Sequence, residues 1–73
     1  MSFYADCLSS LDSSLKKYPE EYHFMIIDVL VNHLDYTDYN QIEDFLKYAM
    51  EKVSLEIQQQ IQSSYELKQF LED

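Results

Sequence analysis

The 73-residue chain contains no glycine, no arginine, one proline and one cysteine. Without glycine it has no Asn-Gly or Asp-Gly hairpin turn and no glycine-rich loop to cradle a phosphate. The lone cysteine, Cys7, excludes a disulfide within the chain and is typical of a reducing cytoplasm. These absences favour helices joined by short connections of Asp, Asn, Ser and Thr.

Positive charge is also scarce, because five lysines face fourteen acidic residues and the formal net charge is −9. Affinity for nucleic acids and anionic membranes comes largely from Lys and Arg, so the composition argues against both as direct ligands. A basic protein surface, in contrast, is attracted over a Debye length of roughly 8–10 Å. No run approaches the roughly 20 apolar residues of a membrane span, and the N-terminus has no cationic signal region. We therefore expect a soluble, cytoplasmic protein.

The spacing of apolar residues predicts a single all-α domain over residues 1–73, a compact bundle of about four short helices. The expected helices cover residues 3–17, 19–34, 39–53 and 55–72. Ser2 is the expected N-cap of the first helix, and Pro19 opens the second. Asp38, with Gln41 three residues on, has the pattern of a capping box for the third helix. The pair Ser63-Ser64 is a candidate break within the last one.

The second expected helix is apolar on nearly every side between residues 22 and 34. Such a helix is central in a bundle or packs against a second chain as well. A strand is the competing interpretation of the β-branched residues 26–31, but no second strand-like run exists to pair with it. We expect Ile26 and Leu30 of this helix to lie in the core.

The residue types that catalysis and metal binding require are few and badly spaced. His23 and His33 are ten positions apart, a rotation of about 280° on one helix, and neither is expected to approach Cys7. The oxygens of Asp35 and Asp38 lack the alternating spacing and central glycine of a calcium loop. The sequence therefore predicts no enzyme and no catalytic, cofactor-binding or metal-binding residue.

Residues 18–46 contain seven acids, four tyrosines and no lysine. Surface tyrosines provide rigid contact area with a polar tip, and carboxylates pair with Arg and Lys of a partner. The alternative is that the acids only keep a small domain soluble and the tyrosines fill the edge of its core. On the first interpretation, the predicted partner-binding residues are Glu20, Glu21, Asp35, Tyr36, Asp38, Tyr39, Glu43 and Asp44.

In size and composition the chain resembles small acidic helical proteins that bacteriophages use against host CRISPR effectors, restriction enzymes or recombination nucleases. No motif carries this resemblance. It implies an inhibitor in the host cytoplasm that occupies a basic, nucleic-acid-binding surface of a target protein. One alternative is an antitoxin or immunity protein that neutralises a basic toxin. Another is a structural subunit that forms a homodimer through residues 19–34 or through the C-terminal Phe70 and Leu71.

Overall fold

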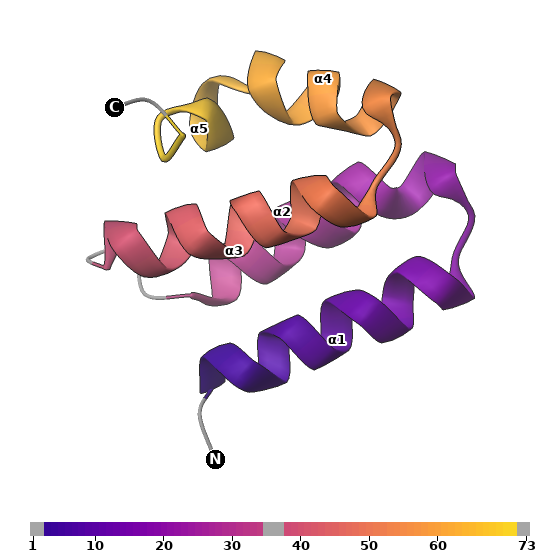
Figure 1. Cartoon of the computed structure of the whole chain (residues 1–73), viewed down its shortest axis with the longest axis horizontal. Helices are drawn as coiled ribbons and strands as arrows, with labels where there is room; N and C mark the ends of the chain where they lie inside the picture. The colour runs from indigo at the N-terminus through magenta and orange to yellow at the C-terminus, as the bar shows by residue number, and fades with distance from the viewer. Residues whose placement is uncertain (1–2, 35–37, 72–73) are drawn as a thin grey trace.

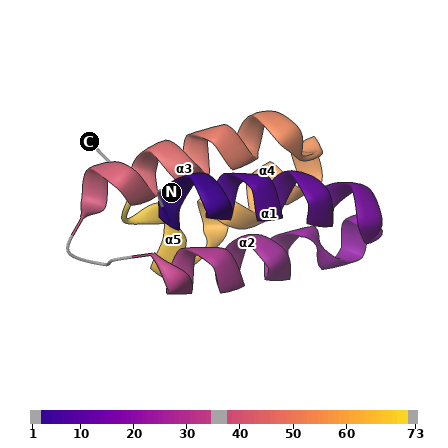
Figure 2. The same ribbon diagram turned by 90° about the horizontal axis from the view of Figure 1, so that it is seen from below.

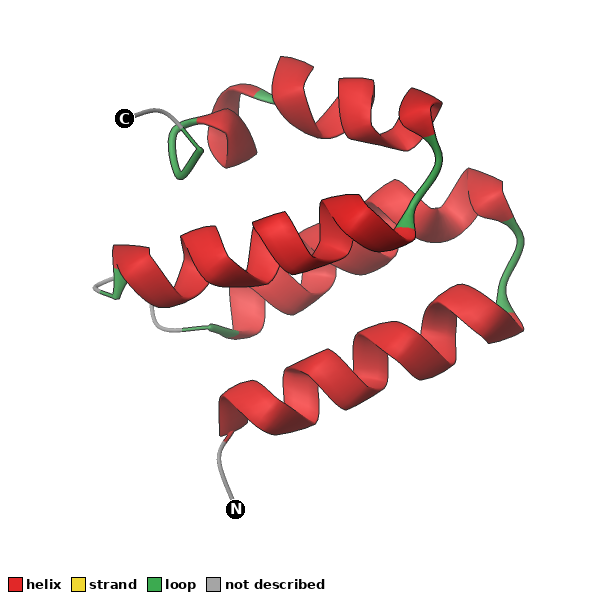
Figure 3. Cartoon of the chain, viewed as in Figure 1, coloured by secondary structure: helices red, strands yellow, loops and turns green. Residues whose placement is uncertain are grey.

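The computed structural model describes residues 3–34 and 38–71, and these fold into helices joined by short turns (Figures 1 and 3). The predicted all-α bundle is confirmed. The predicted cap Ser2 lies outside the described residues. The elements are α1 (Phe3–Lys17), the 3₁₀ helix η1 (Glu20–Tyr22), α2 (His23–His33), α3 (Tyr39–Lys52), α4 (Leu55–Ser63) and α5 (Tyr65–Lys68).

The apolar helix α2 packs against three other helices of the bundle. It runs antiparallel to α1, and α3 then returns in the direction of α1 (Figures 1 and 2). Helix α4 turns back beside α3 and leads into α5. Helix α2 contacts α1, α3 and α4, as expected of a central helix, but Met25 and Val29 on its outer face are exposed.

The core is formed by the apolar residues of α2 and of the helices that pack against it. Ile27 and Val31 of α2 are fully buried, whereas Ile26 and Leu30 are only partly buried at the edge. The expectation that Ile26 and Leu30 lie in the core is therefore wrong. The buried residues are the next ones in sequence, and one residue corresponds to a rotation of about 100° around the helix. In α3 the apolar residues spaced three and four apart, Ile42, Phe45, Leu46 and Ala49, are fully buried, and Met50 further along is partly buried.

The start of α2 differs from the prediction. Pro19 has extended backbone angles (φ −66°, ψ 163°) and caps η1, so the α-helix begins at His23. The turn is held by the N–H of Tyr22, which donates to the carbonyl of Pro19 at 3.0 Å. The ring Nε2 of His23 lies 3.0 Å from the carbonyl oxygen of Tyr18, which ties α2 to the end of α1.

Side-chain caps set the beginning of α3, α4 and α5. Asp38 Oδ1 accepts from the N–H of Gln41 at 3.1 Å, as predicted. Ser54 Oγ accepts from Ile57 and Ser64 Oγ accepts from Leu67, both at 3.3 Å.

The expected last helix, residues 55–72, is therefore two helices, because Ser64 is extended between α4 and α5. The chain changes direction at Ser64. After this change, Leu67 and Phe70 are both buried in the core. The first residues of α4 and α5, Leu55 and Tyr65, are apolar but 68% and 85% exposed.

Candidate interaction surface

The structure divides the predicted partner-binding residues between two ends of the bundle. Glu20 and Glu21 lie in η1, at the turn between α1 and α2, whereas Asp38 lies at the start of α3 (Figures 1 and 2). The eleven-residue helix α2 separates these ends by about 16 Å. Asp35 and Tyr36 lie outside the described residues. The acidic stretch is thus continuous in sequence but not a single patch in space.

Several residues of this set have local contacts. The Asp38 carboxylate caps α3, and Glu43 Oε2 lies 3.6 Å from Lys47 Nζ one turn further along. The exposed ring of Tyr39 packs edge-on against Phe70, with the ring centroids 4.9 Å apart. Only part of this set is therefore available to a partner without loss of a contact that supports the fold.

Two acids, Asp44 of the predicted set and Asp12 outside it, interact with tyrosines between α1 and α3. Tyr48 Oη donates to Asp12 Oδ2 at 2.7 Å, and this bond is the first cause, ahead of burial and the Asp12 charge, that raises the pKa of Tyr48. Lys52 Nζ lies 5.2 Å from the centroid of the same ring. Burial, and then the charge of Asp44, raise the pKa of Tyr4. Asp12 thus has a structural role that its place in the sequence does not reveal.

One histidine, His33, lies nearer to Cys7 than the sequence predicted. His33 and Cys7 line the same hollow, about 340 Å³ in volume, together with Asp6. Cys7 is only 4% exposed, and burial, followed by the nearby Asp6 charge, raises the pKa of its thiol. A catalytic thiolate requires a lowered pKa and access to solvent, so this cysteine has the properties of a core residue.

Residues 3–34 and 38–71 bring together no group of three His, Cys, Asp or Glu side chains that could hold a metal ion. In the same residues no helix combines the length and the apolar character needed to cross a membrane. His23 lines a separate hollow of about 300 Å³ between α1 and α3, with Asp12, Lys16 and Lys52. Its ring Nδ1 is buried and has no hydrogen-bond partner.

Exposed apolar side chains gather on one side of the molecule, along the seam between α1 and α2. In the described part of the chain eight large apolar residues are exposed, and five of them belong to this seam or its ends. Met25 is 55% exposed and Val29 47% exposed, on the outer face of α2. The remaining three exposed residues of the seam are Phe3, Tyr18 and Tyr22. This clustering is more than the scatter of single apolar residues usual on a protein surface.

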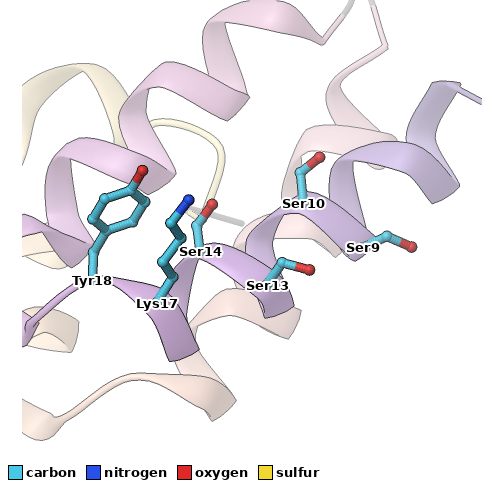
Figure 4. Close-up of a pocket in the computed structure, with 6 residues that line it drawn as sticks. All are labelled: Ser9, Ser10, Ser13, Ser14, Lys17 and Tyr18. Atoms are coloured by element: carbon cyan, nitrogen blue, oxygen red, sulfur yellow. The ribbon is translucent and has the colours of Figure 1, made fainter.

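Four neighbouring hollows share residues along this seam and form one groove, which we call the α1–α2 groove. A hollow of about 530 Å³ is lined by Tyr18, Tyr22, Met25 and Ile26, and the next shares Met25 and Ile26 with it. The hollow that contains Cys7 continues the groove through Leu30. A fourth lies over the serines of α1, with Lys17 and Tyr18 at its end (Figure 4). Its serines are Ser9, Ser10, Ser13 and Ser14.

The chain matches no protein-family model, no curated protein and no solved structure. Two features of the described residues bear on function, the surplus of surface carboxylates and the α1–α2 groove. The sequence indicated half of the groove, because residues 22–34 are apolar on nearly every side. It did not indicate the α1 half. The serines at positions 10 and 14, one turn apart, are the signal that marks a shallow, small-residue wall there.

Proposed function

We propose that this protein is a protein-binding inhibitor that covers a basic, nucleic-acid-binding surface of a target protein. The supporting observation is that few acidic side chains form contacts within the fold. Eleven of the fourteen acidic residues lie in the described part of the chain, since only Asp35, Glu72 and Asp73 fall outside it. Within that part, a single ion pair forms, between Glu43 and Lys47.

The acids are spread over the bundle instead of being gathered in a pocket. Every helix from α1 to α5 carries at least one, and η1 carries two. A field of this kind accelerates encounter with a basic partner and repels nucleic acid and other acidic proteins. Targets of the matching chemistry include CRISPR effectors and restriction enzymes, in keeping with the resemblance to phage inhibitors. An immunity protein against a basic toxin has the same surface requirement.

The test begins with capture of host proteins on the immobilised chain, followed by identification of each captured protein. Each is then purified and bound to a labelled DNA duplex, and the chain is added as competitor while fluorescence anisotropy is recorded. We expect the chain to displace the duplex, and we expect a variant with fewer charges to displace it much less. That variant combines Glu20→Gln, Glu21→Gln, Asp44→Asn and Glu51→Gln, all at exposed positions whose side chains form no hydrogen bond or ion pair in the structure.

Asp38 and Glu43 are omitted from this variant because one caps α3 and the other forms the ion pair with Lys47. A matched control replaces four exposed neutral residues by alanine and retains full competition. Capture of no nucleic-acid-binding protein, or equal competition by the charge-reduced variant, would contradict the proposed function. The residues of the control are Asn40, Gln59, Gln60 and Gln62.

A self-associating structural subunit is the second candidate function. The observation that favours it is the exposure of Met25 and Val29 on the outer face of α2, the helix that the sequence singled out for dimerisation. The C-terminal alternative has less support, because Phe70 is buried in the monomer and Leu71 is partly buried. Light scattering at millimolar concentration tests this candidate, and a monomer under those conditions rules it out.

A further inference from the structure

The α1–α2 groove has the length and walls of a docking site for one helix. It runs beside α1, whose fifteen residues extend for about 22 Å, or roughly four helical turns. One wall is apolar, with Ile26 and Leu30 partly buried beneath the exposed Met25 and Val29. The opposite wall is lined by the serines of α1, which are short enough for another backbone to approach closely (Figure 4). Phe3 stands at one end and Tyr18 at the other.

The walls favour a helix over an extended segment as the occupant. An extended peptide gains affinity by adding hydrogen bonds to the free edge of a sheet. Both walls of this groove are helices, whose backbone N–H and C=O groups are already paired within the helix, and the described residues contain no strand. A helix brings its own satisfied backbone and needs only an apolar stripe at i, i+3, i+4 and i+7.

Charge selects a basic partner over a second copy of this chain. The lining of the groove contains one acid, Asp6, and one lysine, Lys17, so the preference for a basic partner comes from the acids of the molecule as a whole, whose net charge is −9. Asp6 lines the groove near Phe3, and Glu20 and Glu21 flank it near Tyr22, although Lys17 also lies at that end. Two copies of the chain repel each other, because each has a net charge of −9. Lysines or arginines beside the apolar stripe of a partner helix are attracted instead.

We propose that the α1–α2 groove receives a basic amphipathic helix of the target protein, an inference that rests on the proposed function and names the element of the target that is held. The apolar stripe of that helix packs on Met25, Val29 and the partly buried Ile26. Its basic flanks face Asp6 and the acids of η1. The groove holds the complex together, while the carboxylates elsewhere on the bundle guide its formation.

The test uses a synthetic peptide as the probe, because the target is not needed for it. The peptide has about 18 residues, with leucines at i, i+3, i+4 and i+7 and lysines elsewhere. It is titrated into the ¹⁵N-labelled full chain while amide chemical shifts are followed. The largest changes are expected at Ser10, Ser14, Tyr18, Met25 and Val29. A peptide of scrambled order and one with glutamates in place of lysines are expected to bind at least about tenfold more weakly.

A pair of matched variants locates the site. The double variant Met25→Gln and Val29→Gln removes exposed apolar surface from the groove without a change of charge, and it should weaken peptide binding about tenfold. Leu55→Gln with Tyr65→Gln removes similarly exposed apolar surface elsewhere, and it should leave the affinity within about twofold. Equal affinity of all three proteins, or shift changes confined to other faces, would overturn the inference.

Two outcomes separate this inference from the proposed function. If the charge-reduced variant fails to compete with duplex DNA while the Met25→Gln, Val29→Gln variant competes normally, the groove inference is overturned and the proposed function stands. If the peptide binds the groove but no captured protein is displaced from DNA, the proposed function fails alone. A chain that dimerises by itself, with the groove amides broadened in the absence of peptide, shows that a second copy is the occupant and overturns the inference.

Discussion

At the scale of single residues, the side chain of Gln58 closes the C-terminal end of α3. Its Nε2 donates to the carbonyl of Met50 at 2.9 Å and to that of Val53 at 3.3 Å. The last carbonyls of a helix have no partner within the helix, so this amide satisfies two groups that the turn leaves open. The adjacent Gln59 and Gln60 are exposed, so of these three consecutive glutamines only Gln58 is partly buried.

Replacement of Gln58 by alanine is expected to lower the free energy of unfolding by about 1–2 kcal/mol, since two partly buried hydrogen bonds are lost. Urea unfolding followed by far-UV circular dichroism measures the change. Gln59→Ala is the control, at an exposed position in the same helix, and should leave the midpoint unchanged. Equal effects of the two substitutions would show that the Gln58 bonds do not stabilise the fold.

Tyr48 couples stability to alkaline pH. The hydrogen bond to Asp12 raises the pKa of Tyr48 above its unfolded value of about 10, so the folded protein holds the phenolic proton more tightly. The resulting stabilisation is complete below about pH 10 and is lost as the pH rises through the raised pKa. Tyr4, whose pKa burial and Asp44 raise, adds a second contribution of the same sign.

We therefore expect Tyr48→Phe to make the decline in unfolding free energy between about pH 9 and pH 11 shallower, with the remainder due to Tyr4. Urea midpoints measured across that range provide the comparison. A double-mutant cycle with Asp12→Ala isolates the bond between the two side chains. A slope identical to that of the wild type would mean that Tyr48 titrates alike in the folded and unfolded states.

At the scale of elements, the rotation of α2 decides which of its apolar residues hold the fold together. Ile27 and Val31 face the core, and Met25 and Val29 face solvent, although all four are apolar. A helix that is apolar on nearly every side has no distinct polar face, so its own sequence does not orient it. The orientation comes from the neighbours α1, α3 and α4 that enclose one side of it.

Ile27→Asp is expected to unfold the protein, because an unpaired carboxylate at a fully buried position costs on the order of several kcal/mol. Val29→Asp, two residues further along α2, should cost less than about 1 kcal/mol, since that side chain is half exposed. Circular dichroism and urea unfolding of the two purified variants decide the matter. A folded Ile27→Asp protein, or an unfolded Val29→Asp protein, would show that α2 is rotated differently.

At the scale of the whole molecule, the acidic residues and the exposed apolar residues are distributed differently. The carboxylates occur on every helix, whereas five exposed large apolar residues gather at the α1–α2 groove. Long-range charge mainly changes the rate of association, and short-range packing mainly changes the rate of dissociation. The two proposals therefore predict effects on different rate constants.

Surface plasmon resonance with a captured target measures those constants. The association rate should fall about tenfold when salt rises from about 50 to about 300 mM, and the variant with four fewer charges should associate slowly at low salt. Met25→Gln with Val29→Gln should instead raise the dissociation rate and leave association nearly unchanged. Association that is independent of salt would contradict a role for the acids in target encounter.

The sequence was most informative where a signal is local. Spacings of three and four, together with Asp38 as a cap, predicted α3, and the last helix was expected to begin at residue 55, where α4 begins. The break at Ser63-Ser64 was also visible, because serine competes for backbone hydrogen bonds. The start of α2 was harder to predict, since Pro19 suits either the first residue of a helix or the extended residue before it.

For the candidate site, the sequence by itself determined the charge and the apolar excess of residues 22–34, because both follow from composition. Only the tertiary structure decided where these residues lie. It divided the acidic stretch between the two ends of α2, placed Asp12 against Tyr48, and joined α1 serines to α2 apolar residues in one groove. These relations depend on how helices pack against each other, and the directions of contact between helices are not contained in the periodicity of any one of them.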